Sequence, residues 1–275
     1  MLAPAKVNLV LRTGPRRADG YHALETLLVA LDVGDEVALE PAAATSVEAP
    51  ALEGGDTLVT GALHLLARQA GHPGGWRVRI EKRVPVGAGL GGGSSDAGVA
   101  LRLANATLPR PLPVADLVAL AAQIGSDVPF FALGQPSAIA TGRGELVEAA
   151  PLRATFAVAL AWPGESVATA AVYAAHRAAG DIPAGGAAGA AAAIDALALA
   201  PLVVNDLALA AESLAPASAA LRRALLERGA LAACVSGSGS AVFGLFASRD
   251  EAQHALHDLP GVAWRAAAEP LRCHP

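Results

Sequence analysis

The sequence predicts an α+β fold arranged in two lobes. Strand-like and helix-like segments are mixed along the chain, without the regular strand–helix–strand repeat of a parallel sheet. The length of 275 residues fits two packed layers or two modest domains, and we place a boundary near residue 150, giving 1–150 and 151–275. Hydrophobic residues make up 53% of the chain and charged residues only 16%, which predicts a large core and argues against disorder.

Strand patterns dominate the first half. Residues 6–12 and 24–33 are rich in leucine and β-branched side chains, and residues 35–40 alternate apolar with polar ones. Residues 76–84 alternate again, which puts every second side chain on one face. The apolar members of that face are Trp76, Val78 and Ile80.

Two helices are expected in the same half. Asp56 is placed to cap a helix over about residues 58–70, which Gly71 and Pro73 would end. A second helix should cover about residues 95–106, directly after a glycine-rich loop. The order is therefore strand, glycine loop, helix.

In the second half, clear helix and strand patterns follow an alanine- and glycine-rich stretch. Residues 183–200 are rich in alanine and glycine, which indicates a flexible loop leading into a helix. The patterns after it predict a helix near 217–228, strands over 231–237 and 240–246, a helix near 250–257 and a strand over 262–268.

Composition excludes several classes of function. The net charge of −5 gives no basic face for a nucleic-acid backbone, and the only local basic clusters are the pairs Arg16–Arg17 and Lys82–Arg83. Two arginines in a loop are usually solvated. Cys234 and Cys273 make no disulfide framework, so we expect a reducing cytoplasm. We expect no membrane partner, because no apolar run reaches the ~18 residues needed to span a bilayer, and the first residues lack the order of a signal peptide. The oligomeric state does not follow from the sequence.

The glycine loop carries the most chemistry. Residues 84–98 read VPVGAGLGGGSSDAG, with five glycines within positions 87–93. Glycines adopt backbone angles closed to other residues and let a ligand approach main-chain N–H groups. The helix that follows has free N–H groups and a dipole that favour an anion. These features favour a phosphate-binding loop over the alternative of a bare tight turn.

Two familiar phosphate loops do not fit. A P-loop needs Lys followed by Ser or Thr after its last glycine, and here Gly93 is followed by Ser94. The letters GAGLGG match the dinucleotide pattern, but they lie about 90 residues into the chain rather than after the first strand. Neither class is therefore predicted.

Three segments resemble the signatures of the GHMP kinase superfamily, in the same order. They are APAKVNLVLR at 3–12, the loop PxxxGLGGGSSDA at 85–97, and CVSGSGSAVFGLF at 234–246. The resemblance implies a two-lobed GHMP kinase fold with the active site in the cleft between the lobes, ATP as phosphate donor and Mg²⁺ as its metal. It implies ATP binding by Pro85, Gly87, Gly89, Leu90, Gly91, Gly92, Gly93, Ser94 and Ser95.

Within that superfamily the chain is similar to the diphosphocytidyl-methylerythritol kinases. The segment DGYH at 19–22 is the strongest marker, and GSDVPFF at 125–131 and the Asn-Asp-Leu at 205–207 agree with it. The resemblance implies phosphorylation of the 2-hydroxyl of a cytidine-diphosphate-linked polyol, a step of non-mevalonate isoprenoid biosynthesis. Departures are Thr57, where Asn is usual and which leaves the adenine contacts open, and Ala208, where Glu is common. A kinase for another small alcohol and a non-catalytic sensor on the same fold are the alternatives.

Asp127 is the candidate catalytic base. It is a lone carboxylate in apolar company between Gly125 and Pro129, and by itself the pattern fits a helix cap equally well. The resemblance implies that Asp127 is the base and that Lys6 is its cationic partner, stabilising charge on the transferred phosphoryl group. Asn8 should share a strand face with Lys6, and we expect it to bind hydroxyls of the substrate.

Aromatic residues are only 4% of the chain, so each is informative. By resemblance, Tyr21 and His22 bind the cytosine base, and Tyr173 supplies a second aromatic face, although its helical spacing from Thr169 also fits a core position. A magnesium ion takes oxygen ligands, for which Ser94 or Ser95 is the candidate.

Overall fold

The computed structural model describes residues 1–52, 56–177 and 180–272, and Cys273 lies outside them. Two sheets organise these residues. A seven-stranded sheet has the order β3-β4-β2-β1-β8, with β5 paired to β2 and β6 paired to β5. A four-stranded sheet has the order β11-β7-β10-β9. The mixture of mainly antiparallel sheets and helices confirms the predicted α+β class.

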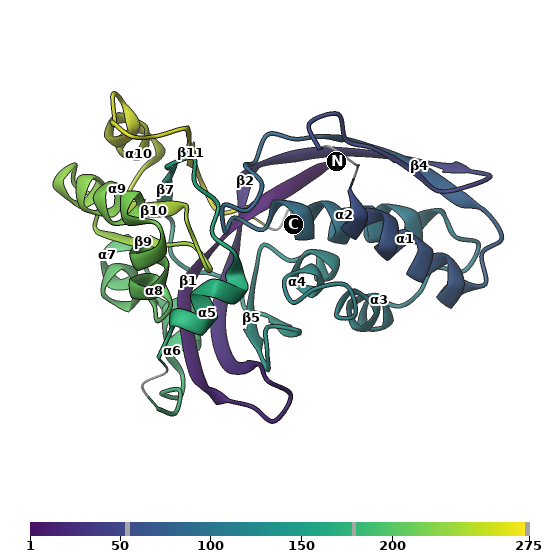
Figure 1. The fold of residues 1–275 in the computed structure, drawn as a ribbon, viewed down its shortest axis with the longest axis horizontal. Helices are drawn as coiled ribbons and strands as arrows, with labels where there is room; N and C mark the ends of the chain where they lie inside the picture. Colours follow the sequence, from purple (N-terminus) through teal and green to yellow (C-terminus); the bar gives the residue numbers. More distant parts are fainter. Residues whose placement is uncertain (53–55, 178–179, 273–275) are drawn as a thin grey trace.

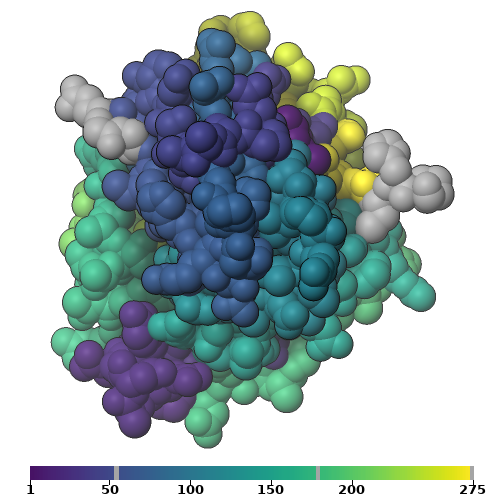
Figure 2. All heavy atoms as spheres, turned by 90° about the vertical axis from the view of Figure 1, so that its right-hand side faces the viewer, coloured from purple at the N-terminus to yellow at the C-terminus, as the bar shows by residue number. Residues whose placement is uncertain are grey.

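A long hairpin forms the spine of the molecule. Strands β1 (Leu2–Arg16) and β2 (His22–Ala42) pair antiparallel and cross between the two halves, and their connection projects at the lower edge (Figures 1 and 2). The predicted strand segments thus merge into two strands. The backbones approach so closely that a Cβ on Gly34 would stand 2.1 Å from the Ala3 carbonyl oxygen, which explains the glycine.

The first sheet is completed around this hairpin. Strand β4 pairs with β2, and its Trp76, Val78 and Ile80 are buried, as the alternation predicted. Strand β8 pairs in parallel with β1, so the sheet recruits a strand from beyond residue 150. The remaining strand bounds are Ser46–Glu48 (β3), Gly75–Glu81 (β4), Ser137–Thr141 (β5), Leu146–Ala149 (β6) and Val204–Asn205 (β8).

Helices α1 and α2 behave largely as predicted. Helix α1 (Thr57–Ala70) begins after Asp56, whose side chain accepts from the Val59 N–H, and ends at the left-handed Gly71. Helix α2 (Gly92–Thr107) begins three residues earlier than expected, inside the glycine loop itself. The same side of the molecule carries α3 (Val114–Ala121) and α4 (Val128–Leu133) (Figure 1).

The second sheet and its helices form the other side (Figure 1). The helices predicted near 217–228 and 250–257 and the three predicted strands are all present. The bounds are Ala157–Trp162 (β7), Thr169–Ala175 (α5), Ala208–Leu214 (α8), Pro216–Glu227 (α9), Ala232–Val235 (β9), Val242–Phe246 (β10), Arg249–Leu256 (α10) and Trp264–Ala268 (β11).

The alanine-rich stretch is more regular than predicted. It forms α6 (Gly186–Ala192), α7 (Ala196–Leu199) and the 3₁₀ turn η1 (Ala200–Leu202). Alanine is the best helix former, and the side chains of Ala187 and Ala190 are buried where α6 meets β1 and β2. The expected loop was therefore wrong for most of this stretch, and the small side chains serve close packing on the hairpin.

One hydrophobic cluster joins the two sheets. It combines Val7 and Leu27 of the hairpin with Val158 and Phe243 of the second sheet, all fully buried. A second cluster lies between the first sheet and helices α1, α2 and α3. The first cluster contains residues from both sides of residue 150, so the packing does not mark a boundary there. The proposed boundary remains a prediction. Within the described residues, no helix is long and apolar enough to cross a membrane.

The second cluster supplies a test of core packing. Leu63 on α1 is fully buried, and truncation to alanine leaves a cavity against the sheet. We expect Leu63→Ala to lower the free energy of unfolding by about 2–5 kcal/mol, measured by urea titration. Leu146→Ala, at a position 62% exposed, should change it by less than about 0.5 kcal/mol. Equal losses in the two variants would show that α1 is not part of the core.

Candidate active site

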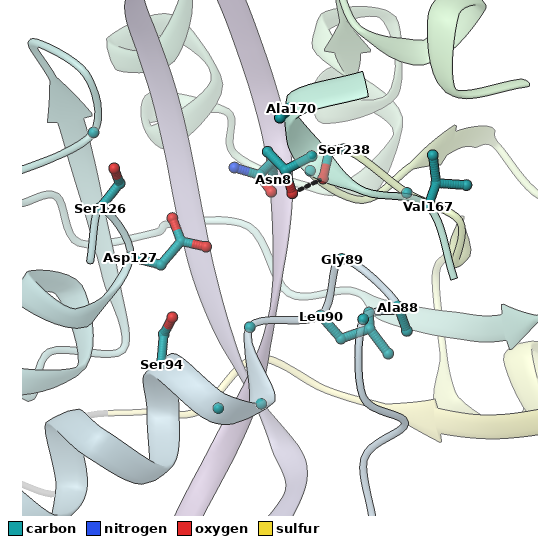
Figure 3. A pocket seen from close by; sticks show the side chains of 18 of the residues that line it. Asn8, Ala88, Gly89, Leu90, Ser94, Ser126, Asp127, Val167, Ala170 and Ser238 are labelled. Carbon is teal, nitrogen blue, oxygen red and sulfur yellow. Dashed lines mark hydrogen bonds between the residues drawn. The ribbon is translucent and has the colours of Figure 1, made fainter. Parts of the chain in front are cut away.

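A cavity of about 1490 Å³ is lined by residues from both halves of the chain. Pockets for one small ligand usually measure ~300–1,000 Å³, so this cavity has room for two. Asp127, Ser126 and Ser94 lie on one side, and Gly89 with Leu90 and the turn carrying Ser238 lie across from them (Figure 3).

Lys6 lies at the centre of the site on β1. The residue is 3% exposed, and its Nζ donates to Asn8 Oδ1 at 2.7 Å and pairs with Asp127 Oδ2 at 3.4 Å. A buried ammonium group is costly unless it is paired and hydrogen-bonded, and both conditions are met here. The structure thus brings together the two residues that the sequence analysis paired.

Asp127 precedes α4 at the position of a helix cap. Its side chain accepts no capping hydrogen bond, and 36% of it is exposed. Figure 3 shows the carboxylate directed into the cavity. Its neighbours Val128, Phe130 and Phe131 are buried and fix the turn from behind. The geometry therefore favours the interpretation as a reacting group over that of a helix cap.

Asn8 shares the strand face of Lys6, as predicted. Its Oδ1 accepts from Lys6, and its Nδ2 donates to Thr26 Oγ1 at 2.8 Å. Thr26 in turn donates to the Val10 carbonyl at 2.6 Å. This chain of hydrogen bonds fixes the amide and hence the ammonium of Lys6. Asn8 also lines the cavity, and its contact with substrate hydroxyls stays a prediction.

The glycine loop has the conformation that the sequence implied. Gly87, Gly89 and Gly91 have φ of 71°, 82° and 74°, which other residues rarely adopt. Gly91 is the N-cap of α2 and contributes no side-chain cap. The first N–H groups of a 16-residue helix are therefore left for a ligand, and the helix dipole favours an anion there.

The loop is held against the rest of the site by backbone contacts. The Lys6 N–H donates to the Leu90 carbonyl and the Ala241 N–H to the Ala88 carbonyl, each at 2.9 Å. A Cβ on Gly89 would stand 2.3 Å from the Ser236 carbonyl oxygen, so only glycine fits. The three signature segments of the sequence thus meet at one point.

All of the predicted nucleotide-binding residues except Ser95 line the cavity. Ser95 is fully buried, and its hydroxyl has no hydrogen-bond partner among the described residues. Ser94 lines the cavity, and its hydroxyl faces it (Figure 3). The others that line it are Pro85, Gly87, Gly89, Leu90, Gly91, Gly92 and Gly93.

Sequence reasoning missed most of one end of the cavity. Thr57 lies at this end, and its departure from the family pattern was the one signal in the sequence, although it did not identify the residues around it. Nearby, burial raises the pKa of Asp96 to about 7, against the opposing effect of Lys82. The additional lining residues here are Ala51, Leu52, Asp56, Thr57, Leu58 and Lys82.

An aromatic cluster forms the opposite end. The rings of His22 and Tyr173 stack with centroids 5.8 Å apart and planes at 28°. His22 Nδ1 lies 2.9 Å from the Gly14 carbonyl oxygen, which only accepts, so Nδ1 carries the proton and Nε2 of the neutral ring is an acceptor. Burial, and secondarily Asp127, raises the pKa of Tyr173 to about 12, so its hydroxyl remains a donor.

Tyr21 lies apart from this stack. It is 52% exposed, and the Arg143 guanidinium lies 5.1 Å from its ring centroid. The ring against Tyr173 is that of His22, so a cytosine sandwich between Tyr21 and Tyr173 stays a prediction. Arg143 also lines the cavity and was missed, because it lies 122 residues from Tyr21 in the sequence.

His176 is a further residue that sequence reasoning missed. Its Nε2 lies 2.6 Å from Thr13 Oγ1, and its ring meets His22 edge-on at 6.1 Å. Its place three residues after Tyr173, directly after the end of α5, was the available signal. Burial lowers the pKa of His176, His22 lowers it further, and Asp206 opposes both.

Comparison with known proteins agrees with this geometry. The model described as "GHMP kinases N terminal domain" matches residues 57–135, and that described as "GHMP kinases C terminal" matches residues 187–262. The chain is 42% identical to a 4-diphosphocytidyl-2-C-methyl-D-erythritol kinase of Anaeromyxobacter sp. (strain K), over 97% of this chain and 87% of that protein. A protein of the same name from Mycobacterium tuberculosis (strain ATCC 25618 / H37Rv) is 42% identical over 86% of this chain and 78% of its own length.

Solved structures agree with the family at the higher identity and with the fold at the lower one. A crystal structure of 4-(cytidine 5'-diphospho)-2C-methyl-D-erythritol kinase superposes with a TM-score of 0.84 and 37% identity, covering 98% of each chain. A homoserine kinase from Cytophaga hutchinsonii shares the fold, with a TM-score of 0.68 and 21% identity over 93% of this chain and 89% of its own.

The fold, the glycine loop and the pairing of the buried Lys6 with Asp127 together define a small-molecule kinase of the GHMP class. The identities above carry the assignment one level further. The chain belongs to the family of 4-diphosphocytidyl-2-C-methyl-D-erythritol kinases.

The lowered pKa of His176 predicts how stability depends on pH. The unfolded chain, with a histidine pKa of about 6.5, binds this proton more readily than the folded chain. Stability contributed by neutral His176 is therefore present above about pH 6.5 and is lost as the pH falls toward the folded-state pKa.

We expect His176→Gln to remove this loss while keeping a hydrogen bond to Thr13. Urea unfolding at pH 8, 7, 6 and 5 should show the stability of the variant, relative to the original chain, rising steadily on acidification. His64→Gln, at an exposed position on α1, is the matched control. A difference independent of pH would mean that His176 titrates as it does in the unfolded chain.

Proposed function

We propose that this protein transfers the γ-phosphoryl group of ATP to the 2-hydroxyl of 4-diphosphocytidyl-2-C-methyl-D-erythritol, giving the 2-phosphate and ADP. The observation that carries the proposal is the Lys6–Asp127 pair, which lines one cavity together with the glycine loop and the uncapped start of α2, and this cavity has room for two ligands. The family and the names of its relatives supply the substrate.

The glycine loop is the proposed site for the ATP phosphates. The positive φ angles of Gly87, Gly89 and Gly91 and the free N–H groups of α2 give it the character of an anion site. The adjoining end would then contact the adenosine, through its lining residues Ala51, Leu52, Asp56, Thr57 and Leu58.

Mg²⁺ is the metal expected with ATP. The donor set fits it, since Ser94 offers a hydroxyl oxygen beside the phosphate loop, and Mg²⁺ usually keeps several waters and takes its other ligands from phosphates. No group of three His, Cys, Asp or Glu side chains within the described ranges is arranged to hold a metal. Ser94 would therefore hold the ion together with ATP, and the ion would neutralise phosphate charge.

Asp127 and Lys6 divide the chemistry between them. The substrate hydroxyl oxygen attacks the γ-phosphorus, the bond from phosphorus to the ADP oxygen breaks, and Asp127 orients the hydroxyl and accepts its proton. The Lys6 ammonium, fixed by Asn8, stabilises negative charge that grows on the transferred group. Both side chains are already in place, so little reorganisation is needed.

The stacked pair His22 and Tyr173 is the proposed platform for cytosine. Nε2 of His22 is an acceptor, which matches the amino group of cytosine and not the carbonyl that uracil has at the same position. Arg143 and Arg16 line the same end and offer positive charge for the diphosphate. We further propose a cytoplasmic location, consistent with the free thiol of the buried Cys234.

A coupled assay of ADP release tests the function directly. Turnover should require 4-diphosphocytidyl-2-C-methyl-D-erythritol and should be absent or much slower with homoserine, mevalonate or the uridine analogue. Comparable turnover with homoserine or mevalonate would instead assign the protein to another small alcohol. ATP binding without turnover of any alcohol would indicate a sensor.

The catalytic pair gives the sharpest test of mechanism. Asp127→Asn preserves shape but removes the charge, so we expect kcat to fall by at least ~100-fold, the low end for a positioned general base. Affinities for ADP and for the cytidine substrate, measured by calorimetry, should change little. Asp116→Asn, on the exposed start of α3, is the matched control.

Lys6→Ala should lower kcat strongly as well, because it removes the charge that faces Asp127. The double variant should be little worse than either single one, since residues that act as a unit are not additive. Fully multiplicative losses would show that the two residues act independently. Near-normal kcat in Asp127→Asn would reduce this aspartate to a structural role.

The platform predicts which ligand each aromatic serves. Tyr173→Ala should raise KM for the cytidine substrate by roughly 10- to 100-fold, the equivalent of about 1–3 kcal/mol for a lost stack. KM for ATP should stay the same, because Tyr173 lies at the other end of the cavity. Tyr21→Ala, measured in parallel, reports whether the hairpin supplies a second face. Equal rises in both KM values would mean that Tyr173 is structural.

A further inference from the structure

Three buried ionic side chains meet beneath the glycine loop. Lys82 follows β4 before the loop, and Asp96 lies in the first turn of α2 after it. Lys82 Nζ donates to Asp96 Oδ2 at 2.6 Å and to Asp35 Oδ2 at 2.5 Å. The lysine side chain is 6% exposed and both carboxylates are fully buried. Lys82 therefore joins the two ends of the loop to each other and to β2.

The second oxygen of Asp35 fixes the entry to the loop. Asp35 Oδ1 accepts from the Arg83 N–H at 2.5 Å and from the Val84 N–H at 2.8 Å. These are the last two residues before Pro85, where the loop begins. Entry and exit of the loop are thus both held by side chains that lie behind it.

Charge alone does not explain this cluster. It combines two carboxyl groups with one ammonium group, and Asp56 adds a third carboxyl in the vicinity. Carboxylates beneath an anion-binding loop oppose the binding of a phosphate. Buried ion pairs also gain little net stability compared with apolar packing. A role in fixing the shape of the loop accounts for their presence.

We propose that Lys82, Asp35 and Asp96 form a clamp that holds the glycine loop in its nucleotide-binding shape, which makes Lys82 a positioning residue for the nucleotide. The proposal rests on the proposed function only in taking residues 85–95 as the ATP phosphate site. Since Lys82 also lines the cavity, the competing explanation is a direct contact between its ammonium and the nucleotide.

The two explanations predict opposite changes in nucleotide affinity when Asp96 is removed. If charge alone mattered, Asp96→Ala would strengthen the binding of an anionic nucleotide, because a nearby carboxyl group is lost. If the clamp matters, Asp96→Ala should weaken binding, as Lys82→Met should. We expect both variants to bind ADP about 10-fold or more weakly, the scale on which loss of an outer-shell partner weakens a bound group.

The measurement is calorimetric titration with ADP and Mg²⁺, which needs no acceptor substrate. Arg83→Met is the matched control, because Arg83 is the next residue along the chain but is half-exposed and pairs with Glu36 and Glu81. Its affinity for ADP should be unchanged. A thermal melt of each variant ensures that the titrations are made on folded protein.

Amide hydrogen exchange supplies a second readout, independent of ligand. In the nucleotide-free protein, residues 84–95 should exchange faster in Lys82→Met and Asp96→Ala than in the original chain or in Arg83→Met. If Lys82→Met does not fold, Asp96→Ala decides the question by itself.

Two outcomes would overturn the clamp. In the first, Lys82→Met binds ADP weakly while Asp96→Ala binds it as well as or better than the original chain, and Lys82 then acts as a direct ligand. In the second, both variants bind normally. Failure of the original chain to phosphorylate the cytidine substrate, with ADP binding as expected, would sink the substrate assignment and leave the clamp intact.

Discussion

The buried ammonium of Lys6 is the interaction on which the arrangement of the cleft depends. It lies on the central hairpin, its backbone N–H is bonded to the glycine loop, and its side chain pairs with Asp127 at the start of α4. A charge buried in this way requires its partners at fixed distances. The hydrogen bonds and the ion pair of Lys6 therefore align the hairpin, the glycine loop and the start of α4, which are remote in sequence. The same alignment creates the space in which phosphoryl transfer is proposed to occur.

Close backbone packing supports that arrangement. The glycine loop touches both β1 and the turn around Ser236, and at Gly89 no side chain can be accommodated. The hairpin extends from this point to the aromatic end, where His22 meets Tyr173. By our proposal, one pair of strands thus positions groups for both the phosphates and the base. This explains why the hairpin is buried along most of β1 and shared by both halves of the molecule.

Much of the fold could be predicted because its signals are local. Asp56 and Gly71 bracket α1, and the alternation of Trp76, Val78 and Ile80 marks β4. The alanine-rich stretch was misjudged, because low complexity suggests a loop while burial of Ala187 and Ala190 against the hairpin favours helices. In the site, glycine loop, Lys6 and Asp127 carried recognisable patterns. His176, Arg143 and Lys82 did not, because their roles depend on neighbours distant in sequence.

The sequence by itself determined the class of fold, the position of the glycine loop and the identity of the charged pair, since each depends on residue types at short spacing or on signatures of a known family. Tertiary structure decided the rest. It showed that Asp127 faces the cavity and caps nothing, that Ser94 and not Ser95 faces it, and that His22 rather than Tyr21 stacks on Tyr173. The direction of a side chain and its burial depend on the packing of the whole chain, which local patterns do not encode.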